Sequence, residues 1–286
     1  MTTQPRAIDV HVHPSIPEYL SEAGGKYLES AAHYFKQKLE PTSIDQMASY
    51  YRERSLFGVL LGWDAETTSK CPPLSNDLVA EICRKHPDVF IGFAGVDPWK
   101  GKLAIEELER SIQELGLRGA KFQQAAQAFF PNDHRFYPFW ELLQELEAPV
   151  LFHMGTTGYG AGAPGGLGVK LKYTQPIPYL DDVAADFPRL PIIGAHPAWP
   201  WVDEMTAVAL HKANVYIDLS GWSPKYFPES LVRDMNSRLQ DKCLFGSDYP
   251  FLAPDRWLKD FESLPLKDEV REKILFSNAQ RLLKLP

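Results

Sequence analysis

Two histidines, His11 and His13, lie two residues apart in the segment "AIDVHVHPSI", which otherwise has the apolar character of a β-strand. Side chains at positions i and i+2 of a regular strand point to the same face, so both imidazoles are expected to face one point. Neutral imidazole is a ligand for Zn²⁺ and similar divalent ions. The pair therefore predicts a metal site, provided that other donors converge on the same place.

Further candidate donors end other apolar runs. His153 closes "PVLFHMG", His196 closes "LPIIGAHP", and Asp248 follows "CLFGS". Each histidine alone is as well explained by a buried ring bonded to a backbone carbonyl, and Asp248 alone is explained as a helix cap. Taken together, four of the eight histidines and one aspartate end strands of one chain, which indicates a divalent metal with an open position for water.

The elements that must position these donors alternate along the chain. Short runs rich in Val, Ile, Leu and Phe, typical of parallel strands buried on both faces, are separated by amphipathic stretches. Eight such alternations predict a (β/α)8 TIM barrel, in which functional residues lie at the C-terminal ends of the strands. The predicted strands cover residues 7–13, 58–64, 89–97, 119–124, 149–155, 190–197, 214–222 and 243–250.

Two segments are longer than simple connections. No change in composition marks a second domain, so we expect one barrel domain over residues 1–286. Residues 14–57 are predicted to hold an extra helical piece near the barrel mouth. Residues 155–176 are rich in glycine and are expected to form an irregular loop over the site. This loop lacks the glycine spacing of nucleotide-binding loops, although its backbone N–H groups could approach an extended ligand.

The composition excludes several classes of function. The 286 residues carry a net charge of −7 and no basic stretch, which argues against nucleic acid as a partner. The apolar runs are too short to cross a membrane. Three cysteines without close spacing fit a reducing compartment, and the N-terminus has no signal-peptide pattern, so we expect a cytoplasmic protein.

The whole pattern resembles the amidohydrolase superfamily, in particular the amidohydrolase-related branch that includes aminocarboxymuconate-semialdehyde decarboxylase. The likeness lies in "DVHVHP", "RGAKFQQ", "PVLFHMG", "GAHP", "VYIDLSG" and "FGSDYP".

The resemblance implies that His11, His13, His153 and Asp248 hold one divalent metal ion, with Zn²⁺ expected first and Mn²⁺ or another ion as the alternative. It also implies that His196 is the acid–base or carbonyl-polarising group and that Asp248 accepts and later returns a proton. Some superfamily members carry a carboxylated lysine that bridges two metals, and Lys121 lies near that place. Family likeness also suggests a homodimer.

Residues near the predicted mouth are candidates for contact with a small-molecule substrate. Trp199, Trp222 and Tyr249 follow strands and are expected to form aromatic walls, while Arg54 is a candidate to bind a carboxylate. Asp9 is expected to share the face of His11, where it either orients a metal ligand or is a satisfied buried carboxylate.

Two reactions suit this site. We expect a metal-dependent hydrolase that activates water against a small organic acid, aromatic or acyl compound. The alternative is a non-oxidative decarboxylase of an aromatic or muconate-type acid. A non-catalytic barrel that binds a ligand is a third possibility, although such a protein would be expected to have lost part of the five-residue set. Metal analysis of the purified protein separates it from the two enzymes.

Overall fold

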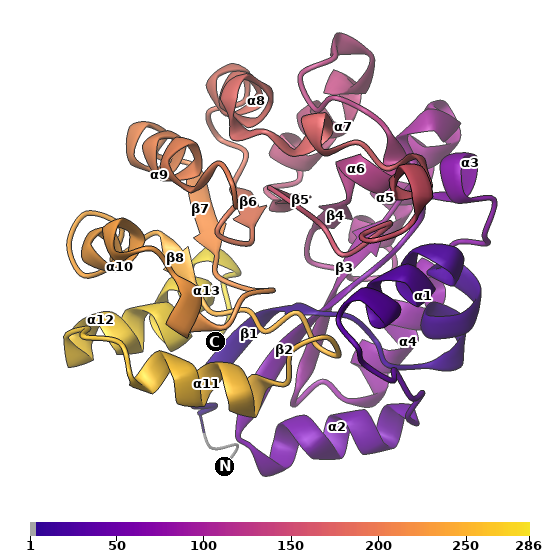
Figure 1. Cartoon of the computed structure of the whole chain (residues 1–286). Coiled ribbons are helices and arrows are strands. Elements are labelled where there is room, and N and C mark those ends of the chain that lie inside the picture. Colours follow the sequence, from indigo (N-terminus) through magenta and orange to yellow (C-terminus); the bar gives the residue numbers. More distant parts are fainter. Residues whose placement is uncertain (1–3) are drawn as a thin grey trace.

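Eight parallel strands form the centre of the molecule (Figure 1). The computed structural model describes residues 4–286, and the strands pair in chain order from β1 to β8. Val10 N donates to Phe245 O at 2.9 Å and His13 N donates to Tyr249 O at 2.8 Å, which joins β1 to the end of β8 and closes the barrel. The predicted (β/α)8 barrel is confirmed. The strands are β1 (Ala7–Val12), β2 (Leu56–Leu61), β3 (Phe90–Gly95), β4 (Ala120–Phe122), β5 (Val150–His153), β6 (Ile192–Ala195), β7 (Val215–Asp218) and β8 (Cys243–Leu244).

Helices surround the barrel on the outside (Figure 1). Their starts follow ordinary capping chemistry: Ser43 Oγ accepts from Gln46 N at 3.1 Å, and Gln46 Oε1 accepts from Ser43 N at 2.9 Å, which begins α2. Within residues 4–286 we find no helix with the length and apolar character needed to cross a membrane. The helices are α1 (Gly25–Tyr34), α2 (Ile44–Glu53), α3 (Glu66–Ser69), α4 (Asn76–Lys85), α5 (Lys102–Gln113), α6 (Gln124–Gln127), α7 (Tyr137–Glu145), α8 (Asp181–Asp186), α9 (Val202–His211), α10 (Glu229–Met235), α11 (Pro254–Glu262), α12 (Asp268–Glu272) and α13 (Asn278–Leu282).

The N-terminal half of the barrel interior is an apolar core that is separate from the larger core between strands and helices. Its members come from six strands, and residues around α13 close it from below. Bulky branched residues dominate, as is usual where inward-pointing side chains fill a barrel. The buried members are Ile8, Val10, Val59, Leu61, Phe93, Leu151, Ile193, Ala195, Leu244, Phe276, Ala279 and Leu283.

Strand β1 contains an irregularity that decides where its side chains point. Asp9 pairs with Gly58 and Val12 pairs with Leu60, so three steps on β1 oppose two steps on β2. One extra residue of this kind is a β-bulge, which shifts the alternation of side chains by one position. As a result Val10 belongs to the interior core, and the adjacent His11 also points into the barrel.

The segment between β1 and β2 supplies the predicted extra helical piece. A short π-helix, η1 (Glu18–Ala23), is followed by α1. The glycine-rich loop after β5 lies against this segment, because Tyr159 and Tyr19 share a hydrogen bond at 3.0 Å between their hydroxyls and Gly160 N donates to Ser30 Oγ at 2.8 Å. The loop is irregular up to residue 163, and the short helical turns that follow it are η4 (Pro164–Gly168), η5 (Leu171–Thr174) and η6 (Pro176–Leu180).

Candidate metal centre and active site

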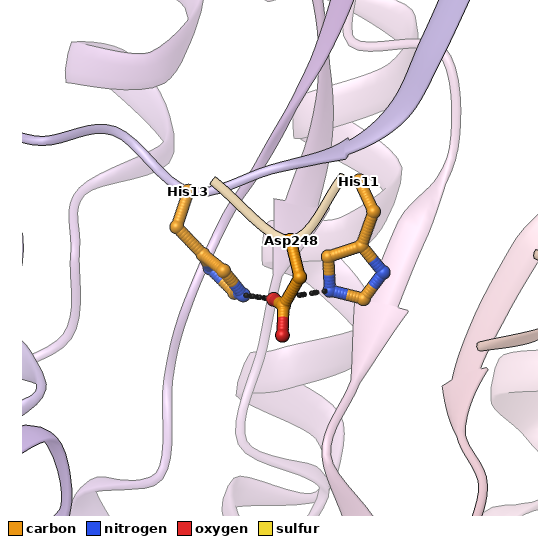
Figure 2. A group of neighbouring side chains, drawn as sticks. All are labelled: His11, His13 and Asp248. Atoms are coloured by element: carbon orange, nitrogen blue, oxygen red, sulfur yellow. Dashed lines mark ion pairs between the residues drawn. The ribbon is translucent and has the colours of Figure 1, made fainter. Parts of the chain in front are cut away.

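Three of the predicted metal donors meet at the C-terminal mouth of the barrel (Figure 2). Asp248 Oδ1 lies 3.4 Å from His11 Nε2 and 3.5 Å from His13 Nε2. The donor atoms of the three residues all lie within 4.8 Å of one another. Asp248 follows β8 with a φ of +70°, a conformation that non-glycine residues adopt rarely and that is often found at functional sites.

The proton on His11 can be located from its neighbours. Its Nδ1 lies 2.6 Å from Asp218 Oδ2, and a carboxylate only accepts hydrogen bonds, so this nitrogen carries the hydrogen. The neutral ring then leaves a lone pair on Nε2, which faces a carboxylate oxygen of Asp248. Two electron-rich atoms in this position attract a cation between them, so the donor set fits a divalent metal ion.

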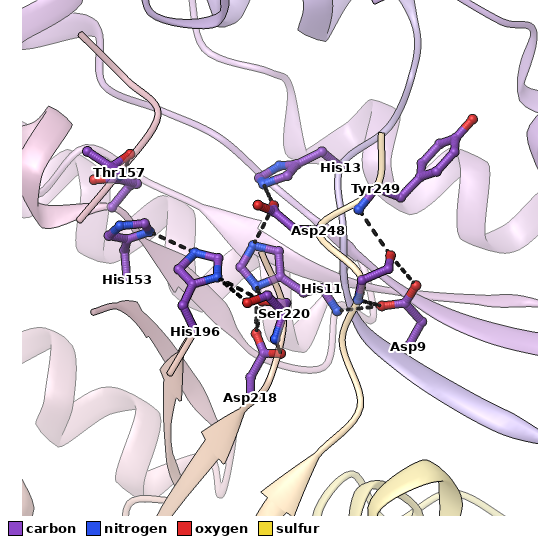
Figure 3. Close-up of polar contacts among 12 residues, drawn as sticks. Asp9, His11, His13, His153, Thr157, His196, Asp218, Ser220, Asp248 and Tyr249 are labelled. Carbon is purple, nitrogen blue, oxygen red and sulfur yellow. Dashed lines mark hydrogen bonds and ion pairs between the residues drawn. The ribbon is translucent and has the colours of Figure 1, made fainter. Parts of the chain in front are cut away.

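His153 and His196 form the second half of the site (Figure 3). His196 Nε2 and His153 Nδ1 are 3.1 Å apart. The outer nitrogens face backbone carbonyls, with His196 Nδ1 3.0 Å from Ser220 O and His153 Nε2 3.0 Å from Thr156 O. Carbonyls only accept, so both hydrogens lie on the outer nitrogens and both inner nitrogens have lone pairs. His153 Nδ1 is thus available as a metal ligand and His196 Nε2 as a base.

Burial keeps these imidazoles neutral. It lowers the pKa of His11 and His153 well below the ordinary value, and the positive charge of Lys121 or of the neighbouring histidine lowers the pKa further. Burial also lowers the pKa of His13 and of His196, although Asp248 opposes that shift. Because a metal binds the unprotonated nitrogen, four neutral rings are ready to coordinate or to accept a proton.

Asp248 itself is an ionised donor. Burial acts to raise its pKa, but the hydrogen-bonding contact with His13 and the position beside the His11 and His196 imidazoles outweigh burial and hold the pKa below its usual range. The side chain keeps 18 % of its surface exposed to the cavity. It can therefore serve as a ligand and still reach a bound molecule.

Sequence reasoning missed two residues of the site, Asp218 and Ser220. Asp218 Oδ2 accepts from His11 Nδ1 and from Ser220 Oγ, the latter at 2.8 Å, and burial raises the pKa of Asp218 to about 6. It fixes the orientation of His11 as a carboxylate commonly does behind a metal-binding histidine. A signal was present in the sequence, since Asp218 ends a strand run in the same way as the other donors.

Two glycines leave room for this network. A Cβ atom at Gly221 would lie 2.5 Å from His196 Nδ1, and one at Gly246 would lie 2.1 Å from Asp218 Oδ1. Any larger residue would push the histidine or the aspartate out of place.

Asp9 does not lie where the sequence predicts. Its neighbours Ile8 and Val10 point into the barrel, so Asp9 points outward, and the bulge that follows puts His11 on the opposite face. Its carboxylate accepts from Tyr51 Oη on α2 at 3.0 Å, from Ser247 N at 2.8 Å and Oγ at 2.6 Å, and from His11 N at 3.2 Å. Asp9 is therefore a satisfied buried carboxylate that ties β1 to the loop before Asp248, and it does not contact a ligand ring.

The donors form the floor of a cavity of about 400 Å³. Its walls are largely aromatic and come from α1, the loop after β5 and the ends of β6 to β8. Pockets of this size and character suit a small organic ligand. The wall residues with aromatic side chains are Tyr34, Phe35, Tyr159, Trp199, Trp222 and Phe251.

Of the predicted substrate contacts, Trp199 and Trp222 line the cavity, whereas Arg54 and Tyr249 do not. Arg54 Nε pairs with Asp255 Oδ2 at 2.7 Å, and its guanidinium lies 3.7 Å from the ring centre of Tyr50. The ring of Tyr249 stacks on the ring of Tyr50, with 5.6 Å between the ring centres. Both residues therefore lie in the outer packing against α2, outside the cavity lining where the sequence analysis expects them.

Lys121, the candidate bridging ligand, also lines the cavity and is only 3 % exposed.

The fold and this set of donors can now be compared with known proteins. A family model described as amidohydrolase matches residues 8–285, so the chain belongs to the amidohydrolase family. Gamma-resorcylate decarboxylase of Polaromonas sp. is 26 % identical over 259 residues, which cover 78 % of this chain and 78 % of that protein. Decarboxylase orsB of Emericella nidulans is 29 % identical over 266 residues, which cover 75 % and 76 %.

Solved structures share the architecture. An uncharacterized TIM-barrel protein of Bordetella bronchiseptica matches with a TM-score of 0.81 and 26 % identity over 98 % of both chains. A dihydroxybenzoic acid decarboxylase of Polaromonas sp., solved with manganese and the inhibitor 2-nitroresorcinol, matches with a TM-score of 0.68 and 22 % identity over 98 % of this chain and 97 % of the other.

These comparisons correct the expected activity. The relatives are decarboxylases rather than hydrolases, so the prediction of a metal-dependent hydrolase is wrong. The reason lies in the site itself, because the same histidines and aspartate can serve either reaction, and residue types alone do not separate them.

Proposed function

We propose that this protein is a metal-dependent, non-oxidative decarboxylase of a small aromatic acid. The observation that carries the proposal is the convergence of unprotonated His11, His13 and ionised Asp248 at the floor of an aromatic-walled cavity. The similarity to decarboxylases over about three quarters of the chain supports the choice of reaction.

We infer that His11, His13, His153 and Asp248 hold one divalent ion. When bound, such an ion supplies a positive charge that holds and polarises oxygen atoms of the substrate. A donor set with more imidazole than carboxylate suits Zn²⁺, while Mn²⁺ accepts the same donors and is present in the related decarboxylase structure. Metal analysis after growth with both ions decides between them.

The substrate that fits this reaction carries a ring hydroxyl next to its carboxylate, as dihydroxybenzoates do. The carboxylate of Asp248 takes the proton of the hydroxyl as the acid binds, and His196 Nε2 accepts a hydrogen bond from the second hydroxyl or from water. Asp248 then delivers its proton to the ring carbon that bears the carboxylate.

The bond between that carbon and the carboxylate breaks next. Its electron pair restores the aromatic ring, CO2 leaves, and a proton from solvent returns to the ring oxygen. The aromatic walls keep the floor dry during these steps, which strengthens the electrostatic interactions there.

The experiment uses metal-loaded protein and a panel of acids: 2,6-dihydroxybenzoate, 5-carboxyvanillate and 2-amino-3-carboxymuconate-6-semialdehyde. We expect CO2 release from at least one of them and no release after chelation. Absence of CO2 from all three, together with cleavage of an ester or amide by the same protein, would contradict the proposal. The predicted homodimer and the cytoplasmic location remain predictions, which light scattering and cell fractionation test.

A further inference from the structure

Lys121 is a buried charged residue for which the proposed reaction has no use so far. It is the middle residue of β4, and its neighbours Ala120 and Phe122 belong to the core between strands and helices. Since side chains alternate along a strand, Lys121 points into the barrel. It is 3 % exposed and lines the same cavity as His11, His153 and Asp248.

This lysine has no direct partner among the described residues. Burial lowers its pKa to about 8, and only the more distant charges of Asp248 and Asp218 oppose this effect, with no hydrogen bond contributing. A lysine side chain is ordinarily an ammonium at neutral pH. A buried ammonium without a bonded counter-charge is costly, so its presence points to a partner that arrives with the ligand.

Neither nearby aspartate is hydrogen-bonded to Lys121. Asp218 already accepts from His11 and from Ser220. Asp248 lies between His11 and His13. With a divalent ion bound, the cavity floor carries more positive than negative charge, so it favours an anionic ligand.

We propose that Lys121 is a substrate-binding residue that holds the carboxylate of the aromatic acid. This inference rests on the proposed function for the identity of the ligand. It also replaces the carboxylated-lysine role that the resemblance offers for this position. An ammonium can contact one carboxylate oxygen while Asp248 faces the ring hydroxyl, which sets the orientation of the acid in the cavity.

The test measures binding of three probes to Zn²⁺-loaded protein by calorimetry: 2,6-dihydroxybenzoate, benzoate and resorcinol. Resorcinol has the ring hydroxyls without the carboxylate, and benzoate has the reverse. In Lys121→Met we expect the affinity for both acids to fall about 10- to 100-fold, the loss of a charged hydrogen bond. We expect the affinity for resorcinol to change less than about twofold, because it lacks the group that Lys121 holds.

Lys259→Met, an exposed position on α11, is the matched control and should bind all three probes like the wild type. Thermal unfolding separates binding from structure: removal of an unpartnered buried charge should leave the midpoint of Lys121→Met equal or higher. Metal content should be unchanged.

Four results would overturn the inference, and three of them concern Lys121→Met. They are equal loss of affinity for acids and resorcinol, unchanged affinity for the acids, and loss of metal in Lys121→Met together with a carboxyl adduct on Lys121 in the wild type. Failure of the wild type to bind either acid would also overturn it. If the wild type binds the acids through Lys121 but releases no CO2, the proposed reaction fails and the role of Lys121 stands.

Discussion

The two ends of the barrel interior are built from the same strands but contain opposite chemistry. On β5, Leu151 belongs to the apolar core, and His153 two residues later lies at the polar floor of the cavity. Ile193 on β6 and His196, which directly follows that strand, show the same change from apolar to polar. One end therefore specifies and stabilises the fold, and the other end is free to hold charges and a ligand.

We therefore expect substitutions at the polar end of the barrel to reduce activity and substitutions in the apolar core to reduce stability. The largest effect is expected for Asp248→Asn, which removes an ionised metal donor and the proposed proton carrier. We expect kcat/KM to fall by about 10³- to 10⁴-fold, or roughly 4–5.5 kcal/mol of transition-state stabilisation. The midpoint of thermal unfolding of the metal-free protein should change little. If Asp248→Asn keeps more than a tenth of the wild-type activity, the C-terminal end of the barrel does not supply the group that the reaction needs.

The core below the cavity should show the opposite behaviour. Ile193→Ala leaves a cavity among fully buried neighbours, and we expect a loss of about 2–5 kcal/mol in the free energy of unfolding. Activity per folded molecule should stay near the wild-type value at temperatures well below the midpoint. Denaturant unfolding gives the stability, and a parallel assay gives the activity. A large fall in kcat without loss of stability would contradict the separation.

A smaller effect is expected behind the metal ligands. Asp218→Asn replaces the charged acceptor that holds the hydrogen on His11 Nδ1 by a neutral amide, and we expect metal affinity to fall about 10- to 100-fold. Asp241→Asn, which changes a surface ion pair with Lys273, is the control. Competition with a chromogenic chelator measures both affinities. Equal affinities in the two variants would show that Asp218 does not orient the ligand.

The smallest effect is expected outside the cavity. Arg54→Ala breaks an ion pair near the surface, so stability should fall by about 0–1 kcal/mol and KM should stay within about twofold. Trp222→Ala, at the cavity wall, should raise KM more than this. Steady-state kinetics of both variants test the boundary of the site. A large rise in KM for Arg54→Ala alone would place the substrate elsewhere.

The sequence predicts the barrel well because its signals are local and repeated. Buried parallel strands are nearly continuous apolar runs, and polar residues that end them stand out, as His153 and Asp248 do. The bulge in β1 leaves no such signal, since "DVHV" alternates regularly in sequence, and the prediction therefore places Asp9 on the wrong face.

Long-range pairings account for the other differences. Arg54 meets its partner Asp255 only after the chain has closed the barrel, so its sequence neighbourhood does not show that it is engaged. Asp218 ends its strand like the other donors, but a residue behind a ligand has no sequence pattern of its own. The choice between hydrolysis and decarboxylation depends on how the substrate lies over shared residues, which residue types cannot reveal.

The most direct test of the account is a metal titration of chelator-treated protein while CO2 release from 2,6-dihydroxybenzoate and the other two acids is followed. The three donors that meet at one point, with His153 as the proposed fourth ligand, predict that CO2 release rises with added Zn²⁺ or Mn²⁺ and reaches its plateau at one ion per chain. A plateau that requires two ions per chain, or no CO2 from any of the acids at any metal level, would contradict it.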